Sequence, residues 1–307
     1  MFIILAGMLY FLGITTCCAD NEPILPSDDS HMDAVNRALD KAEFSHHNQV
    51  TVASPDVMAK ANELQFSSET YWAKYDEPKN WSQKGVMSGY NAQYAHRIST
   101  DPKAIVNMYS LQAQWAEGKF KQAAYVGPSG IKDRTFDLRG VLGKDFYPAS
   151  YLRVTGYLGY GYRYLKDNSE GLDPVIDGFT LFGYKRYSHY NYIPLGADFV
   201  YQTDRNYSLE SNFEYDYMFN GWQVSKLGVV PGYNTLVVDQ RSGYGLRASL
   251  RLNLYFKYCT AFAESFYRLW DIARSNTKPD PTDPTAQGLN EPKNNTQEFG
   301  FRLGLQV

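Results

Sequence analysis

Ten charged side chains recur at alternating positions of this sequence, within segments that otherwise carry many apolar residues. If these segments are strands, alternation places the ten on one face, because successive side chains of a strand point to opposite sides. Arginines that face carboxylates form charge-assisted, bidentate hydrogen bonds. We therefore expect a structural charge network, and the alternative is a narrow conduit whose arginines attract anions. The ten residues are Asp137, Arg139, Arg153, Arg163, Glu210, Glu214, Asp216, Arg247, Arg251 and Arg302.

Histidine is the other residue type here that supports general acid–base catalysis. An omptin-like protease site needs an aspartate pair opposite an Asp-His pair, but Tyr187 occupies the position two residues before His189. Ser188 and His189 are poor partners for each other, because neighbours in a strand face opposite ways. We expect no enzyme, and an omptin-like or lipid-modifying activity ranks third among the functions considered. The remaining histidines are His31, His46, His47 and His96.

The acidic loop DNSEGLDPVID is the strongest candidate for a metal site. Its carboxylates lack the spacing of a calcium-binding loop, so a solvated loop is the better interpretation. We therefore predict no metal and no cofactor. The carboxylates are those of Asp167, Glu170, Asp173 and Asp177.

The tetrapeptide EPKN occurs twice, at residues 77–80 and 291–294. The first copy follows the first predicted strand and the second precedes the last. If these two strands pair, the copies meet at one rim, although proline and asparagine are common in loops for other reasons. The candidate rim contacts are Glu77, Lys79, Glu291 and Lys293.

The clearest of the positioning elements is residues 242–256, SGYGLRASLRLNLYF. Leu246, Leu250 and Leu254 fall on one face, and Arg247 and Arg251 fall on the other. Segments of about ten residues that alternate in this way, apolar outward and polar inward, are typical of a transmembrane β-barrel.

Nine further segments are read as strands, although the facing of 261–272 is ambiguous, and they bring the number of predicted strands to ten. The even number, together with connections that alternate between long and short, predicts a closed antiparallel transmembrane barrel. Closure satisfies the backbone groups that a bilayer leaves without partners. In the sixth strand, a bulge is expected around residues 187–192. The ten segments are 64–77, 85–97, 106–121, 133–146, 151–166, 179–202, 207–222, 242–256, 261–272 and 296–307.

Composition narrows the class of protein further. A net charge of −3 gives no reason to expect nucleic-acid binding. No apolar run after the N-terminus is long enough for a membrane-spanning helix. The chain has 26 Tyr, 17 Phe and 5 Trp, and amphipathic aromatic residues gather where an apolar band meets water.

The N-terminal part differs from the rest and gives a three-part organisation. Residues 1–19 read as a secretory signal, and lipidation at Cys17 or Cys18 is the competing interpretation. Residues 20–63 read as a periplasmic extension with one short helix, and residues 64–307 as the barrel. Removal of the signal leaves Cys259 alone, so no internal disulfide is expected.

The last segment, EFGFRLGLQV, resembles the C-terminal assembly signal of outer-membrane barrels, although it ends in Val307 rather than Phe. The stretches FDLRGVLGKDF, GYGYRYL, EYDYMFNGWQ, GYGLRASLRL and EPKNNTQEFGFRLG resemble an uncharacterised, small porin-like family of outer-membrane β-barrel proteins of Gram-negative bacteria. The even number of strands and the alternating connections place both termini on the periplasmic side, and we expect a monomer. The resemblance implies contact with outer-membrane lipid and lipopolysaccharide, and with the barrel-assembly machinery.

The function predicted from these observations is a structural or surface-interacting scaffold with five extracellular loops and a charge-filled lumen. The alternative is a narrow channel for small solutes, including anions.

Overall fold

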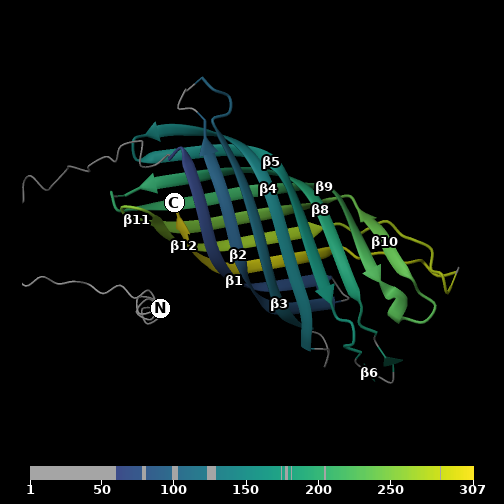
Figure 1. Cartoon of the computed structure of the whole chain (residues 1–307). Coiled ribbons are helices and arrows are strands. Elements are labelled where there is room, and N and C mark those ends of the chain that lie inside the picture. Colours follow the sequence, from purple (N-terminus) through teal and green to yellow (C-terminus); the bar gives the residue numbers. More distant parts are fainter. Residues whose placement is uncertain are drawn as a thin grey trace, which may run out of the picture. The chain divides into compact units, whose positions relative to one another are not determined.

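A computed structural model describes residues 60–307, except 78–80, 99–102, 123–128, 174, 177, 178, 181, 204 and 284. The predicted signal, the lipidation site, the N-terminal helix and Lys79 lie outside these residues. The described chain forms the predicted closed antiparallel barrel of ten strands (Figure 1). The barrel strands are β1 (Asn62–Glu77), β2 (Trp81–Arg97), β3 (Met108–Gln122), β4 (Ser129–Ala149), β5 (Leu152–Asn168), β8 (Lys185–Gln202), β9 (Tyr207–Lys226), β11 (Gly243–Tyr255), β12 (Thr260–Ile272) and β13 (Asn294–Gln306).

The barrel is closed because each of its ten strands pairs with a neighbour on both sides. The first strand, β1, pairs with β2 and with the last strand, β13. The pairing of β8 with β9 completes the ring. Lys74 lies opposite Gln297, and Asp76 lies opposite Asn295. The prediction that the first and last strands are antiparallel neighbours is therefore confirmed.

Connection lengths differ in part from the prediction. β2 begins at Trp81 rather than residue 85, because most of the expected loop EPKNWSQ continues the ladder with β1. At the end of the barrel that carries the C-terminus, which we call the terminal end, three connections span two to four residues and the fourth is 98–107. At the opposite end, which we call the far end, 169–184, 227–242 and 273–293 are the long connections.

The sixth predicted strand, 179–202, is shorter in the structure. It begins at Lys185 as β8, and a separate small pair, β6 (Val175–Ile176) and β7 (Phe179–Thr180), precedes it. The expected bulge is present, since the β8–β9 register shifts between Asn191 and Tyr192.

A short ribbon at the far end was not predicted. β10 (Thr235–Gln240) pairs with β9 in the register that β11 continues, so β10 and β11 extend one another. A 3-10 turn, η2 (Leu227–Val229), lies at its tip. The loop 273–293 lies beside β10, where the Asn276 amide donates to the Asp239 carbonyl at 3.0 Å (Figure 1). The far-end connections 227–242 and 273–293 are thus hydrogen-bonded to each other.

Every barrel strand has exposed apolar side chains on its outward face. Leu250, for example, has 55 % of its surface exposed. Monomeric soluble proteins rarely expose an apolar surface that continues from strand to strand in this way. Among the described residues, no helix is long and apolar enough to cross a membrane. Exposed members, one from each barrel strand in chain order, are Phe66, Tyr90, Leu111, Leu142, Leu158, Leu195, Phe213, Leu250, Tyr267 and Phe301.

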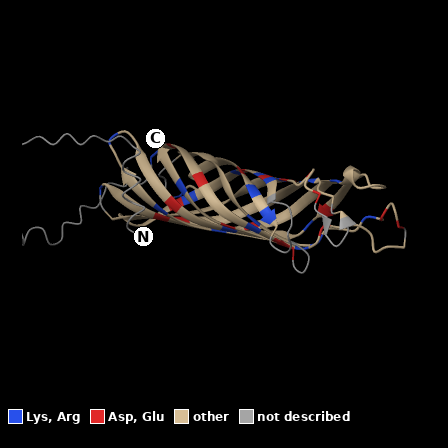
Figure 2. Cartoon of the chain, turned by 90° about the horizontal axis from the view of Figure 1, so that it is seen from below, with Lys and Arg blue, Asp and Glu red and all other residues tan. Residues whose placement is uncertain are grey.

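The interior is mixed rather than uniformly polar. Tyr71, Met87, Phe120, Ile131 and Phe266 belong to one buried apolar cluster, which lies toward the far end. Residues of both charge signs are distributed along the barrel strands (Figure 2). The interior therefore combines an apolar cluster with a charged layer.

Candidate functional site

The ten charged residues predicted to face inward all lie in the interior of the barrel. Eight of them, including Asp137, Arg163 and Arg302, are buried or nearly so. Arg139 and Glu210 retain 17 % and 23 % of their side-chain exposure. The structure brings seven of the ten into one layer at mid-height of the lumen, and we call this layer the lumen network.

One half of the lumen network is centred on Arg247 of β11. Its guanidinium lies 2.7 Å from Asp216, 2.9 Å from Asp137 and 3.2 Å from Glu214. Arg139 forms an ion pair with the same Glu214. Two arginines and three carboxylates from β4, β9 and β11 thus share one set of contacts.

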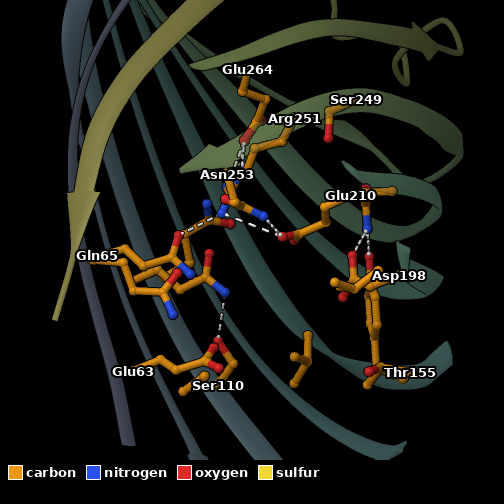
Figure 3. A pocket seen from close by; sticks show the side chains of 18 of the residues that line it. Glu63, Gln65, Ser110, Thr155, Asp198, Glu210, Ser249, Arg251, Asn253 and Glu264 are labelled. Carbon is orange, nitrogen blue, oxygen red and sulfur yellow. Dashed lines mark hydrogen bonds and ion pairs between the residues drawn. The ribbon is translucent and has the colours of Figure 1, made fainter. Parts of the chain in front are cut away.

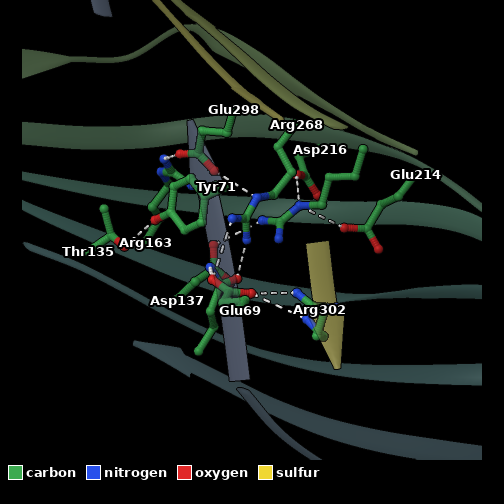
Figure 4. A network of polar contacts seen from close by, with 12 residues as sticks. Glu69, Tyr71, Thr135, Asp137, Arg163, Glu214, Asp216, Arg268, Glu298 and Arg302 are labelled. Carbon is green, nitrogen blue, oxygen red and sulfur yellow. Dashed lines mark hydrogen bonds and ion pairs between the residues drawn. The ribbon is translucent and has the colours of Figure 1, made fainter. Parts of the chain in front are cut away.

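The other half depends on four residues that were absent from the predicted set: Glu264, and the three that Figure 4 labels, Glu69, Arg268 and Glu298.

Glu298 accepts from Arg163 at 2.6 Å, and Arg268 lies 2.7 Å from the same carboxylate. Arg302 binds Glu69 and Glu264, each at 2.8 Å. Arg251, a predicted residue at the edge of the layer, binds Glu264 at 2.6 Å. Each carboxylate here contacts two arginines.

The network is balanced in formal charge when Arg251 is included. It contains six arginines and six carboxylates, so the buried charges compensate one another, as buried ions require. The arginines are Arg139, Arg163, Arg247, Arg251, Arg268 and Arg302, and the carboxylates are Glu69, Asp137, Glu214, Asp216, Glu264 and Glu298.

Tyrosine hydroxyls complete the network from the wall. Tyr192 donates to Asp137 at 2.7 Å, and Tyr157 donates to Glu214 at 2.7 Å. The Tyr192 ring covers Gly161, where a Cβ atom would lie 2.1 Å from the ring. The glycine in GYGYRYL therefore leaves space for the aromatic residue that fixes Asp137.

A polar cavity of about 120 Å³ lies between the network and the terminal end. The two remaining predicted residues line it: Arg153, 3.9 Å from Glu63, and Glu210, 3.9 Å from Arg251. Asn253 donates to Glu210 at 3.2 Å. Figure 3 shows Glu63, Glu210 and Asn253 among the polar side chains that line the cavity.

A second cavity, of about 60 Å³, lies on the far side of the network. Its rim is organised by Arg186, which sequence analysis did not identify. Arg186 lies 3.2 Å from Glu77 and 2.9 Å from Glu291, and Tyr75 donates to both carboxylates. The two glutamates of the EPKN copies thus meet through one arginine.

Lys293 does not reach Glu77 and instead forms an ion pair with Asp271 at 2.9 Å. Of the candidate rim contacts, Lys293 therefore makes no contact with Glu77, because it pairs with Asp271 on the outward face of β12. Burial raises the pKa of Glu291, with a further contribution from Glu77, while Arg186 opposes the rise.

His189 has aromatic surroundings. It points outward, stacks on Trp222 at 4.5 Å between ring centroids, and bonds Tyr162 through Nδ1 at 2.7 Å. Ser188 points inward and donates to Gln223, so serine and histidine lie on opposite faces. Within the described part of the chain, no group of three His, Cys, Asp or Glu residues has a metal-binding arrangement.

No family model and no curated protein matches this chain. Among solved structures, the translocator domain of the autotransporter NalP from Neisseria meningitidis is 11 % identical, covering 91 % of this chain and 95 % of its own, with a TM-score of 0.37. A major outer membrane protein from Thermus thermophilus is 12 % identical, with coverages of 78 % and 99 % and a TM-score of 0.35. The attachment invasion locus protein Ail of Yersinia pestis is 11 % identical, with coverages of 80 % and 99 % and a TM-score of 0.30.

Proposed function

We propose that this chain is an outer-membrane β-barrel that acts as a scaffold: its lumen is closed, and it holds far-end loops at the membrane surface. The observation that carries the proposal is the lumen network, whose six arginines and six carboxylates span the interior between two small cavities. A barrel of this size has an interior that side chains can fill. Solute passage would require buried ion pairs to separate, which is costly.

The membrane assignment is supported by the outward face. The exposed apolar side chains of the ten strands form a belt around the barrel, which we call the apolar belt. Exposed aromatic residues border it, such as Tyr109 and Tyr201 toward the terminal end and Trp72 and Phe299 toward the far end. This is the surface that lipid tails and headgroups solvate best. Its partners are then membrane lipid and, during biogenesis, the assembly machinery.

Orientation is proposed from the connections. Outer-membrane barrels have short periplasmic turns and longer extracellular loops. The terminal end, with its turns of two to four residues, is then periplasmic, and the loops 169–184, 227–242 and 273–293 are extracellular. The ribbon of β9 and β10 and the bridge between Lys278 and Leu289 support the latter two loops.

Planar-bilayer recording of the full chain tests the closed lumen. We expect no steady conductance from the wild type. The double variant R163A/E298A, which removes a contact across the lumen, should raise the conductance. The control K74A/D76A removes an exposed ion pair on the outer wall and should not. A steady wild-type conductance that is lost when Ser249→Trp fills the terminal-end cavity would overturn the scaffold proposal.

The second candidate function is a narrow channel for small solutes. The cavities on the two sides of the network favour it, because only one layer separates them. A channel of this kind would be gated by rearrangement of the lumen network, and the same recordings distinguish it from the scaffold.

A further inference from the structure

Six basic side chains form a continuous surface on the outer wall near the far end. They come from four neighbouring strands, β2 to β5, and their side chains point away from the lumen. We call this surface the basic face. Its residues are Lys84, Lys119, Lys121, Lys132, Arg134 and Lys166.

The sheet register sets these residues directly opposite one another. Lys84 faces Lys121 across β2 and β3, Lys119 faces Lys132 across β3 and β4, and Arg134 faces Lys166 across β4 and β5. Like charges at directly opposed positions of a sheet are destabilising. The barrel fold alone does not account for three such repulsive pairs on neighbouring strands.

Internal compensation of these charges is small. Among the described residues, Glu117 contributes an ion pair to the basic face, 3.1 Å from Arg134, and both side chains are about half exposed. Exposed pairs of this kind contribute little. The surface therefore has a strong excess of positive charge that an external anion would neutralise.

The basic face is hollowed where its charges converge. A surface hollow of about 470 Å³ lies over β3, β4 and β5 and is lined by Lys119, Lys132, Arg134 and Lys166, together with Glu117 and Asp133, so that cationic residues outnumber acidic ones four to two. This places four cationic groups around one space. Phosphate oxygens accept hydrogen bonds from several such groups at once.

An apolar groove lies on the terminal-end side of the basic face, over β13, β1, β2, β3 and β4, so it shares β2 to β4 with the basic face. It measures about 620 Å³ and is lined by bulky residues such as Phe66, Tyr90, Trp115 and Phe136, with Ala113 among the small residues between them. Trp115 lies four residues before Lys119 along β3, which is about 13 Å in a strand. Phosphate-binding groups and an acyl-sized groove therefore lie one above the other.

We propose that the basic face binds the phosphate groups of a lipopolysaccharide-type glycolipid whose acyl chains occupy the apolar groove. The inference rests on the proposed function, because the far end must face outward for this lipid to reach it. An anionic lipid fits better than a free anion, because only the lipid uses both the hollow and the groove. The basic face is confined to one side of the barrel, because the far-end outer faces of β1 and β12 carry the ion pairs Lys74–Asp76 and Lys293–Asp271, whose charges compensate each other.

Native mass spectrometry and thermal unfolding of the full chain in neutral detergent test the proposal, with bisphosphorylated lipid A as the probe. The wild type should retain lipid A and gain thermal stability from it. The variant K119Q/K132Q should bind at least about tenfold more weakly, because charge-assisted hydrogen bonds are lost. Without lipid, the variant should be no less stable than the wild type, because one repulsive pair is removed.

The matched control is K185Q/K226Q. Lys185 and Lys226 also face each other directly, across β8 and β9, but Lys185 has Glu170 as an ion-pair partner and lies outside the basic face. The control should bind lipid A as the wild type does. Equal retention by wild type and K119Q/K132Q would overturn the proposal, and so would equal retention of lipid A stripped of its phosphates.

Three further outcomes distinguish a free anion from a lipid, and the lipid proposal from the scaffold proposal. If inorganic phosphate stabilises the wild type to the same extent as lipid A, the hollow binds a free anion and the lipid proposal is overturned. Lipid A retention by a chain that fails to enter bilayers would contradict the membrane scaffold alone. Bilayer insertion without any preference for lipid A would contradict the lipid site alone.

Discussion

Arg163 on β5 and Glu298 on β13 form an ion pair across the full width of the lumen, with 2.6 Å between Nη2 and Oε1. Four strands separate β5 from β13 in either direction around the ring of ten, so the two residues stand on opposite walls. Both are almost fully buried. The contact therefore ties the walls together and obstructs the lumen at the same point.

The arginine at the centre of the lumen network should be more important for stability than an exposed one. We expect Arg247→Leu to lower the free energy of unfolding by about 3–5 kcal/mol, because it leaves Asp137, Glu214 and Asp216 short of a buried partner. Arg241→Leu is the control, since Arg241 is 80 % exposed on its side chain and lies 3.7 Å from Asp239. Its effect should stay within about 0.5 kcal/mol. Urea unfolding from bilayers measures both, and equal effects would show that Arg247 is not paired inside.

The apolar belt predicts an asymmetry between neighbouring residues of β11. Leu250→Arg should cost about 2–4 kcal/mol in bilayers if the residue lies near the midplane. Ser249→Arg should cost less, because Ser249 lines the polar terminal-end cavity. Unfolding in vesicles of a neutral phospholipid compares the two, and the reverse order would mean that the lipid face has been assigned to the wrong side of the strand.

The raised pKa of Glu291 predicts a pH dependence that one substitution removes. A carboxyl group with a folded-state pKa above its unfolded value of about 4.3 stabilises the fold below that value, and the contribution is lost as pH rises through the folded-state pKa. The unfolding free energy of the wild type should therefore fall, relative to that of Glu291→Gln, as pH rises from about 4 toward neutrality.

Equilibrium unfolding at a series of pH values measures this difference. Glu170→Gln controls for the loss of a carboxylate from the far end, because Glu170 is an exposed partner of Lys185. Curves for the wild type and Glu291→Gln that stay parallel over this range would contradict the prediction.

The sequence predicts the barrel well where the two faces differ clearly. In 242–256, leucines alternate with arginines, so the strand and its inward face follow directly from period two. In β12, by contrast, the inward face cannot be recognised from the sequence. Its inward set mixes Phe262, Phe266 and Trp270 with Glu264 and Arg268, so no apolar face stands out.

Four of the twelve residues of the lumen network were missed, and two of them, Glu264 and Arg268, were missed for this reason. Glu69 lies in the polar run of β1, where serine and threonine on both faces obscure the alternation. β10 was missed because its sequence, TLVVDQ, does not alternate. Arg186 could not be assigned to the rim because the strand that carries it begins six residues later than predicted, which left its surroundings undefined.

The last prediction concerns closure between β1 and β13. In a Cys259→Ser background, Lys74→Cys and Gln297→Cys should form a disulfide, because the two positions are directly opposed. Opposed residues in an antiparallel pair have Cα atoms about 4.5–5.5 Å apart, within the range that a disulfide spans. The control pair, Lys74→Cys with Lys121→Cys, should remain reduced. These positions lie two strands apart, about 9.6 Å, with Lys84 between them.

Non-reducing electrophoresis and intact mass of the folded protein in bilayers detect the cross-link. Because β1 is the less regular of the two strands, its pairing should come late in folding, so the cross-link should form more slowly during refolding than in the folded state. If neither Lys74–Gln297 nor any pair within two residues of it cross-links in the folded protein, β1 and β13 are not neighbours and the ten-strand closure is wrong.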